Sequence, residues 1–402
     1  MKKTKTILVI ILLVTMTGCG GKQSNDDLII VNVTKSYPEK ELILQDFMDV
    51  DYIALETNDE FITTGDVMDI GKEFILVRTV TRNRNGDILI FDRTGKGASK
   101  FNRQGQGPGE YASISKVFLD EDNKEIFIDE FQRKSIKVYD FSGNFTREFH
   151  YKENALYYRM LNYDRESFIC WNETNLASQV YKDEASKTPF FIVSKQDGSI
   201  IEEIKIPFEE IISYTDIIIN RDNQGKIQSV FAINPDNALS IINSQGQWIL
   251  AESSVDTIYR YLPDHTMIPF MTRTPSIRSM DPKVFLLPGI ITDRYYFMQI
   301  FKKEFDLANQ RQVPEVDLLY DRESKALFEY AMYNDDYTDK RHVVMMGKSR
   351  CENDEIVFWQ KLEAFELVEA YKEGKLKGKL KKVAATLDEE DNPVIMIVKH
   401  KR

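Results

Sequence analysis

The chain has 402 residues, of which 42% are hydrophobic, and it carries a formal net charge of −11 at pH 7. This acidic balance argues against a nucleic-acid-binding protein, because such binding depends on cationic contacts to phosphates. It also argues against broad adhesion of the protein body to an anionic membrane face. The length exceeds the usual size of a single hydrophobic core, unless the fold is built from repeats that pack only on their neighbours.

Residues 1–18 are expected to form a signal peptide. Lys2, Lys3 and Lys5 give it a positive start, and residues 7–14 form an apolar segment of eight residues. That segment is too short to span a bilayer, which needs about 20 apolar residues. Loss of the three lysines with the signal takes the net charge from −11 to −14.

The signal ends in Met16-Thr-Gly-Cys19, which resembles the lipobox of bacterial lipoproteins. The resemblance implies that Cys19 carries acyl chains on its sulfur and on the new amino terminus, and stable anchoring needs more than one chain. An ordinary cleaved secretory signal with an incidental cysteine is the alternative.

Residues 19–27 have the polar, glycine-containing composition of a flexible tether. Gly20 follows the cysteine where inner-membrane lipoproteins carry Asp, and by resemblance to sorted lipoproteins this disfavours retention in the inner membrane. We therefore expect a lipid-anchored protein of the cell envelope, held at the outer membrane through acylated Cys19.

A short hairpin pattern recurs along the rest of the chain. In residues 88–95 and 136–143, alternating β-branched or aromatic residues lead to an Asp, a two-residue step and a Gly. The Asp can bond the backbone of the turn, and the Gly accepts a positive φ. Variants of the pattern end at Gly198, Gly246 and Ser324. Intervals near 50 residues with short strands predict a β-propeller, and the longer last interval implies an insertion.

Several segments together resemble the six-bladed β-propeller lipoproteins of bacteria, an NHL-like family. They are Tyr52-Ile-Ala-Leu-Glu-Thr57, Gly105-Gln-Gly-Pro-Gly-Glu-Tyr111, Asp256-Thr-Ile-Tyr-Arg260 with Ile268-Pro269, and Asp391-Asn-Pro-Val-Ile-Met-Ile397. The resemblance implies an all-β fold, a six-bladed propeller with four-stranded antiparallel blades, that covers residues 28–402 as a single domain. It supplies no catalytic residues, because the family has no settled activity.

The glycine-rich loop of residues 103–111 invites comparison with phosphate-binding loops. Those loops open a helix, whereas here Pro108 removes an amide donor and residues 114–119 continue as a strand. A tight connection between blades is therefore favoured. The alternative is that Arg103, Glu110 and Tyr111 face the central channel and contact a ligand, since loops often carry function.

Two acidic segments, residues 120–125 and 334–339, superficially resemble calcium loops. Lys124 replaces a ligand in the first, and the spacing of the second fits no calcium loop, so both are interpreted as solvated hairpin tips.

Residues 365–387 have apolar positions at helical spacing, weakened in the middle by Gly374 and Gly378. We expect one amphipathic helix, interrupted there, on the edge of the propeller. A helix on the membrane surface is the alternative, because lysines cluster in it.

The ring of blades must close, since an exposed strand edge is a template for aggregation. Residues 394–398 and residues 28–33 are both apolar and strand-like. We expect these two segments to share one blade, which then mixes both chain ends.

The sequence holds no catalytic or metal motif. The four histidines, His150, His265, His342 and His400, are far apart, and neither zinc spacing nor a nucleophile elbow is present. No cofactor is expected.

A binding propeller is therefore favoured, one that holds a protein, peptide or glycan partner and no nucleic acid. The alternatives are a propeller enzyme, a lyase or hydrolase acting at the central channel, and a structural subunit of an envelope complex.

Overall fold

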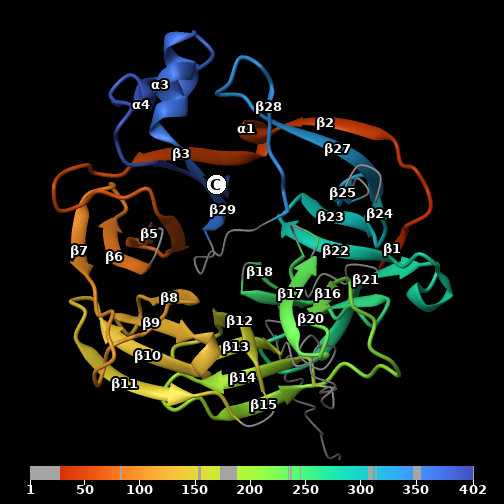
Figure 1. The fold of residues 1–402 in the computed structure, drawn as a ribbon. Coiled ribbons are helices and arrows are strands. Elements are labelled where there is room, and N and C mark those ends of the chain that lie inside the picture. Colours follow the sequence, from red (N-terminus) through yellow and green to blue (C-terminus); the bar gives the residue numbers. More distant parts are fainter. Residues whose placement is uncertain are drawn as a thin grey trace, which may run out of the picture.

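The fold is a ring of six β-sheets around a central axis, seen along that axis in Figure 1. The computed structural model describes residues 28–401, apart from 82–83, 153–154, 173–187, 234, 236–237, 245, 307–310, 313–314 and 347–354. The innermost strands of neighbouring sheets contact each other around the axis, and later strands step outwards. The predicted six-bladed propeller is confirmed.

Blades 1 to 3 are each four antiparallel strands in sequence order. Blade 1 contains β4 (Asp66–Ile70), β5 (Phe74–Thr81), β6 (Arg84–Asp92) and β7 (Gly97–Phe101). Blade 2 contains β8 (Lys116–Asp120), β9 (Glu125–Glu130), β10 (Ser135–Asp140) and β11 (Phe145–His150), with a 3-10 turn at Phe131–Arg133. Blade 3 contains β12 (Tyr157–Asn162), β13 (Ser167–Asn172), β14 (Phe190–Ser194) and β15 (Ile200–Ile204).

Blades 4 and 5 each add an N-terminal strand to four antiparallel ones. Blade 4 has β18 (Ile241–Ser244), β19 (Gln247–Leu250), β20 (Thr257–Tyr261) and β21 (Met267–Thr274), with β1 (Ile29–Asn32) parallel to β21. Blade 5 has β22 (Val284–Ile291), β23 (Tyr295–Lys302), β26 (Val316–Asp321) and β27 (Ala326–Asn334), with β2 (Glu39–Ile43) parallel to β27. The short β28 (Arg341–His342) also pairs with β27, and a 3-10 turn at Ile277–Ser279 joins the two blades.

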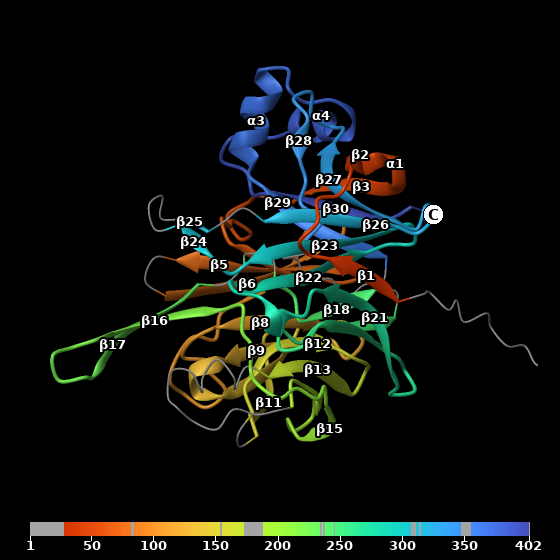
Figure 2. The same ribbon diagram turned by 90° about the vertical axis from the view of Figure 1, so that its right-hand side faces the viewer.

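Two hairpins lie outside the six blades. The strands β16 (Asp216–Arg221) and β17 (Ile227–Ile233) form a two-stranded sheet between blades 3 and 4, which extends away from the ring in Figure 2. The second hairpin pairs β24 (Phe305–Asp306) with β25 (Arg311–Gln312) as a separate sheet, in the connection between β23 and β26 of blade 5.

Blade 6 is assembled from both ends of the chain. Its described strands are β29 (Ile356–Leu362), β30 (Val394–His400) and β3 (Met48–Ala54), with β30 in the middle. All seven residues of β3 pair with β30, from Met48 opposite His400 to Ala54 opposite Val394. The expectation that both chain ends share a blade is confirmed, but the strand expected there is wrong. Residues 28–33 lie against blade 4, because the alternation of β1 buries Ile29 and Val31 in the core between blades 4 and 5.

The turn before β30 fastens this closure. Asn392, which is 1% exposed, donates two hydrogen bonds from its side-chain nitrogen, to the carbonyl oxygens of Glu56 at 2.6 Å and Phe61 at 2.7 Å. Its side-chain oxygen accepts from the backbone N–H of Thr63 at 2.7 Å. The first and last of the segments that carry the family resemblance therefore meet in space.

A separate hydrophobic core lies between each pair of neighbouring blades. One buried cluster joins blades 1 and 2, the next blades 2 and 3, and so on around the ring to the cluster between blades 6 and 1. Ile395 and Ile397 of β30 face blade 1, whereas Val394, Met396 and Val398 face blade 5. Both faces of β30 are buried, so its sequence is a continuous apolar run and does not alternate between apolar and polar residues.

The helical insertion covers blade 6 at the top of Figure 1. Helix α3 (Ala364–Lys372) and helix α4 (Gly378–Ala384) replace the single predicted helix, and the interruption has positive φ at Gly374 (73°) and Gly378 (59°). Buried Leu367 and Leu380 join the core of blades 5 and 6. The expected helix on the propeller edge, interrupted at its glycines, is confirmed. The short helix α1 (Leu44–Phe47) links β2 to β3.

The second acidic segment docks these helices and is not a solvated tip. Asp336 is 9% exposed, and its side-chain oxygens accept hydrogen bonds from the hydroxyl of Tyr52 at 3.0 Å and the backbone N–H of Lys379 at 3.2 Å. A Cβ at Gly378 would lie 1.8 Å from the same carboxylate, so a side chain cannot be added there without movement.

The repeated hairpins are not all equivalent. Those ending at Gly95, Gly143 and Gly198, and the variant at Ser324, join the third and fourth strands of blades 1, 2, 3 and 5. The hairpin ending at Gly246 joins the first and second strands of blade 4 instead. The same sequence pattern therefore marks a different turn of the blade there, after the β16–β17 hairpin. The long last interval holds the rest of blade 4 and most of blade 5, in addition to the small β24–β25 hairpin.

We predict that removal of β30 opens the ring, whereas removal of β1 does not. A chain ending at Asn392 lacks the middle strand of blade 6 and exposes the paired edges of β3 and β29, so it should lose its cooperative thermal transition and aggregate. A chain beginning after Val33 loses only an outer strand and should still unfold cooperatively. Thermal unfolding followed by circular dichroism, together with size-exclusion chromatography, compares the two shortened chains. An unchanged melting temperature in the chain that ends at Asn392 would contradict the closure.

Candidate functional site

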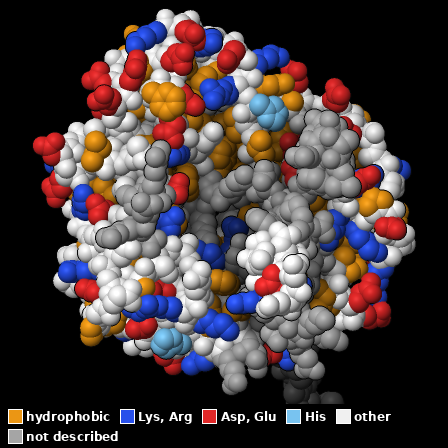
Figure 3. Space-filling model, in the orientation of Figure 1, with side chains coloured by type: hydrophobic (Ala, Val, Ile, Leu, Met, Phe, Trp, Pro, Cys, Tyr) orange, Lys and Arg blue, Asp and Glu red, His pale blue; other side chains and the backbone are white. Residues whose placement is uncertain are grey.

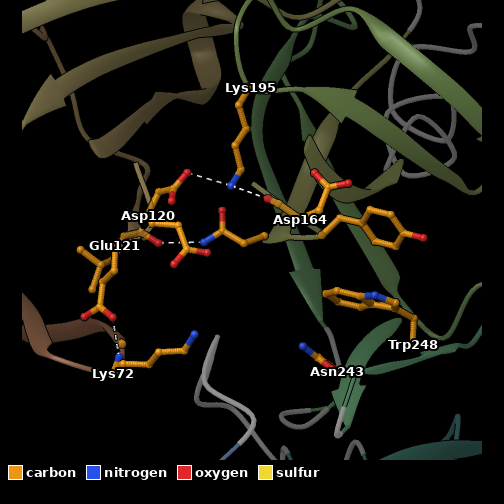
Figure 4. A pocket seen from close by; sticks show the side chains of 13 residues that line it. Lys72, Asp120, Glu121, Asp164, Lys195, Asn243 and Trp248 are labelled. Carbon is orange, nitrogen blue, oxygen red and sulfur yellow. Dashed lines mark hydrogen bonds and ion pairs between the residues drawn. The ribbon is translucent and has the colours of Figure 1, made fainter. Parts of the chain in front are cut away.

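A cavity of about 220 Å³ opens where the inner turns of four blades meet (Figure 4). It is lined by the β4–β5, β8–β9, β12–β13 and β18–β19 turns, which join the first and second strands of blades 1 to 4, and by Lys195 from the β14–β15 turn. We call this cavity the mouth pocket. Because inner strands surround the axis, their turns lie at one end of the ring, where propellers present residues from several blades to one ligand.

The wall between blades 2 and 3 contains a buried ion pair. The Lys195 ammonium lies 2.8 Å from Asp120 Oδ2, and the two side chains are only 4% and 3% exposed. The same ammonium donates to the carbonyl oxygen of Asp164 at 2.7 Å and lies 5.1 Å from the ring centre of Phe168. These contacts satisfy the buried charges and fix the position of one blade tip against the next.

The wall between blades 1 and 2 uses a second carboxylate. Glu121 accepts backbone hydrogen bonds from Lys72 at 2.6 Å, Glu73 at 3.0 Å and Phe74 at 2.8 Å, and so caps the β4–β5 turn. A Cβ on Gly71 would lie 2.2 Å from that carboxylate, so the close approach needs a glycine. The interpretation of residues 120–125 as a solvated tip is therefore wrong for Asp120 and Glu121, which bind protein donors.

Four other side chains face the cavity with their polar groups or rings. Tyr163 and Trp248 form an aromatic wall, with ring centres 5.7 Å apart and planes tilted by 33°. Figure 4 shows the side chains of Lys72 and Asn243 directed into the space between the blades. Within the described part of the chain, the Lys72 ammonium has no ion-pair or hydrogen-bond partner. The side-chain oxygen of Asn243 is buried and also has none among the described residues.

An unpaired buried amide oxygen is costly, by about 1–3 kcal/mol. A bound hydroxyl, amine or water molecule would remove that cost. The arrangement therefore provides one cation, one amide and two aromatic rings to a ligand, and Asp122 adds an exposed carboxylate to the lining.

Figure 3 shows one face of the ring with a hollow in its middle, and Lys and Arg side chains border that hollow. The basic border contrasts with the net charge of −11 for the whole chain. Among the described residues, no cluster of three or more His, Cys, Asp or Glu side chains has the geometry of a metal site. None of the described helices combines the length and the apolar character that crossing a membrane requires.

The glycine-rich loop lies against the β10–β11 hairpin, away from the mouth pocket. Tyr111 is fully buried in the core between blades 1 and 2, and its hydroxyl accepts from the backbone N–H of Arg103 at 2.9 Å. Arg103 Nε donates to the carbonyl oxygen of Gly143 at 2.8 Å, and Glu110 accepts from the N–H of Gly107 at 2.7 Å. Each of these three side chains thus holds the loop in place. The alternative that Arg103, Glu110 and Tyr111 contact a ligand stays a prediction.

The lipidation site Cys19 lies outside the described residues, as do the whole signal and the rest of the tether. The pocket residues Lys72, Tyr163, Asn243 and Trp248 were not singled out from the sequence. The repeat drew attention to turns between third and fourth strands, whereas the pocket is built from turns between first and second strands. The one available signal was the hairpin of residues 242–246, which contains Asn243 and precedes Trp248.

Comparison with known proteins places the chain in a family. Residues 28–399 match the family model DUF4934, described as a domain of unknown function. The chain belongs to this family. No curated protein matches it.

The fold of this DUF4934 protein is similar to that of a candidate exported protein from Bacteroides fragilis, with a TM-score of 0.55 and 14% identity over 90% of this chain and 100% of that chain. It is less similar to a member of the DUF4221 family from Bacteroides vulgatus (TM-score 0.44, 9% identity, 89% and 99% coverage). BamB from Moraxella catarrhalis gives a TM-score of 0.32 and 10% identity, with 85% and 87% coverage. The first similarity shows a shared fold; none of them assigns an activity.

We predict that Lys195→Met lowers the free energy of unfolding by about 3 kcal/mol or more, because it leaves the Asp120 carboxylate buried without its cation. Lys372→Met is the matched control. Its ammonium lies 2.6 Å from Glu389, but the two side chains are 64% and 61% exposed, so little change is expected. Urea denaturation measures both variants, and equal losses would contradict the role given to the buried pair.

Proposed function

We propose that the protein is a lipid-anchored binding protein of the cell envelope that holds a saccharide in the mouth pocket. The observation that carries this proposal is the convergence of four blades on one cavity with uncommitted groups. Lys72 and the Asn243 oxygen lack partners among the described residues. Lys72 lies across the cavity from the aromatic wall of Tyr163 and Trp248, whereas Asn243 lies beside that wall as the cross-strand neighbour of Trp248.

The chemistry of these groups suits a neutral, hydroxyl-rich ligand. Binding sites combine apolar or aromatic walls with a few placed polar groups that fix orientation. A sugar ring has an apolar face that can cover Trp248 or Tyr163, and hydroxyls that both donate and accept hydrogen bonds. One hydroxyl can donate to the Asn243 oxygen while another accepts from Lys72.

The anchor rests on the sequence. Met16-Thr-Gly-Cys19 ends a short apolar segment, and a polar stretch separates Cys19 from β1. The similar Bacteroides fragilis structure is that of a candidate exported protein, which agrees with an exported location for this chain. A tethered ring would keep its mouth pocket available to material at the membrane surface.

We predict that Lys72→Ala and Asn243→Ala each weaken saccharide binding by about tenfold, since each removes a directed polar contact of roughly 1.4 kcal/mol. Lys96→Ala is the matched control, because Lys96 is exposed on the β6–β7 turn of the same blade and lies outside the pocket. An immobilised panel of neutral oligosaccharides and of peptides identifies the ligand, and isothermal titration calorimetry then compares the variants.

Saccharide binding that both variants retain at full strength would exclude the mouth pocket as its site. Binding of peptides alone would exclude the saccharide class. Asn243→Ala is the more specific of the two changes, because Lys72 also lines a second cavity.

We predict that Cys19→Ala abolishes labelling by a radioactive or clickable fatty acid and releases the protein from the membrane fraction of cells that express the full chain. Acyl chains on Cys19 are the expected membrane attachment, so a soluble variant follows from their loss. A variant that still labels and sediments with membranes would show that the anchor is elsewhere.

A further inference from the structure

A second cavity, of about 580 Å³, lies between helix α4, blade 6 and blade 1. We call it the basic cavity. Its charged lining consists of five basic side chains, Lys72, Arg93, Lys379, Lys382 and Lys399, and two acidic ones, Asp51 and Glu355. The lining thus has a formal charge of +3 in a chain whose net charge is −11. A local cluster of positive charge raises the concentration of anions at the cavity, although the negative net charge of the whole protein repels them.

Asp51 holds two of the ammonium groups in place. Its Oδ1 lies 2.7 Å from Lys379 Nζ, and its Oδ2 lies 2.6 Å from Lys399 Nζ. Lys379 also donates to the carbonyl oxygen of Val50 at 2.9 Å. Burial alone would raise the pKa of Asp51, but the hydrogen bonds from the two lysines lower that pKa below its ordinary value. One carboxylate therefore positions two cations and neutralises only one of them.

The other cations reach the cavity from different elements. The Arg93 guanidinium is held by the carbonyl oxygen of Gly71 at 2.7 Å, at the base of blade 1. Lys382 comes from the exposed side of α4 and Lys72 from the β4–β5 turn. Neither of these two ammonium groups has an ion-pair or hydrogen-bond partner among the described residues. Cations from blade 1, blade 6 and the helical insertion thus converge on one cavity, whose described lining has five basic and two acidic side chains.

We propose that the basic cavity is a binding site for a ligand with clustered oxyanion groups, such as phosphates or sulfates. Ammonium and guanidinium groups form their strongest hydrogen bonds with such anions. The volume is within the range of small-ligand sites, so the cavity accommodates more than a single inorganic ion. The helical insertion acquires a role here, because α4 supplies the outer wall of the site.

This site is distinct from the mouth pocket, although Lys72 lines both. The two linings otherwise differ in character: an aromatic wall and an amide in the mouth pocket, and a cluster of cations in the basic cavity. A test that changes Lys382 therefore reports on the basic cavity alone, and its result is independent of saccharide binding in the mouth pocket.

The experiment uses the mature protein with three probes at a fixed ionic strength: sodium tripolyphosphate, a sulfated disaccharide and inorganic phosphate. Isothermal titration calorimetry should show saturable binding of at least one of the two polyanions, more tightly than inorganic phosphate. Lys382→Gln should weaken that binding about threefold and Lys382→Glu about tenfold or more, because a cation at the site is removed or replaced by a repelling charge. The polyanion that binds distinguishes a phosphorylated ligand from a sulfated one.

Lys381→Gln is the matched control, because Lys381 is the neighbouring exposed lysine of α4 and does not line the cavity. It should leave the affinity unchanged, and the circular dichroism melts of all three variants should match that of the unsubstituted protein. Absence of saturable polyanion binding would overturn the proposal. Equal weakening by Lys381→Gln and Lys382→Gln would also overturn it, since that result indicates general surface charge and no specific site.

Discussion

The structure depends on the closure of the ring by β3 and β30. Each blade buries both faces of its sheet only when it has a neighbour on each side, and six cores join six blades. Without the pairing of Met48–Ala54 with Val394–His400, the cores on both sides of blade 6 lose a common strand. Asn392 then ties the turn before β30 to the segment after β3. This constraint couples the two ends of a chain that otherwise folds blade by blade.

Closure also determines where the groups that line the mouth pocket lie. Once the ring is closed, inner turns of successive blades meet at one end of the axis, and Asp120 and Glu121 of blade 2 connect to blades 3 and 1. These two carboxylates serve the walls, which leaves Lys72 and Asn243 directed into the mouth pocket. The same β4–β5 turn borders the basic cavity, whose opposite wall is α4. The two proposed sites are therefore neighbours that use one turn of blade 1.

The fold could be predicted from the sequence because its hairpins and turns are determined by residues close together in the chain. Asp-x-x-Gly turns at Gly95 and Gly143 fix hairpins through short-range hydrogen bonds, and Gly374 and Gly378 mark the helix interruption. The mouth pocket could not be predicted, because its residues belong to four blades and become neighbours only after closure. Asp120 illustrates the difficulty: an acidic hairpin tip looks solvated in sequence, and its cation Lys195 lies 75 residues away. The pairing partner of β30 was missed for the same reason, since β1 and β3 are both N-terminal strands that bury alternate apolar residues.

Hydrogen exchange followed by mass spectrometry tests this account most directly, because it measures the stability of β3 and β30 separately in the intact mature protein. If the two strands close the ring, peptides from residues 48–54 and 394–400 should exchange slowly and together, at the rate of global unfolding. Fast exchange in residues 48–54 while residues 394–400 stay protected would contradict the closure, and with it the arrangement of the inner turns that both proposed sites require.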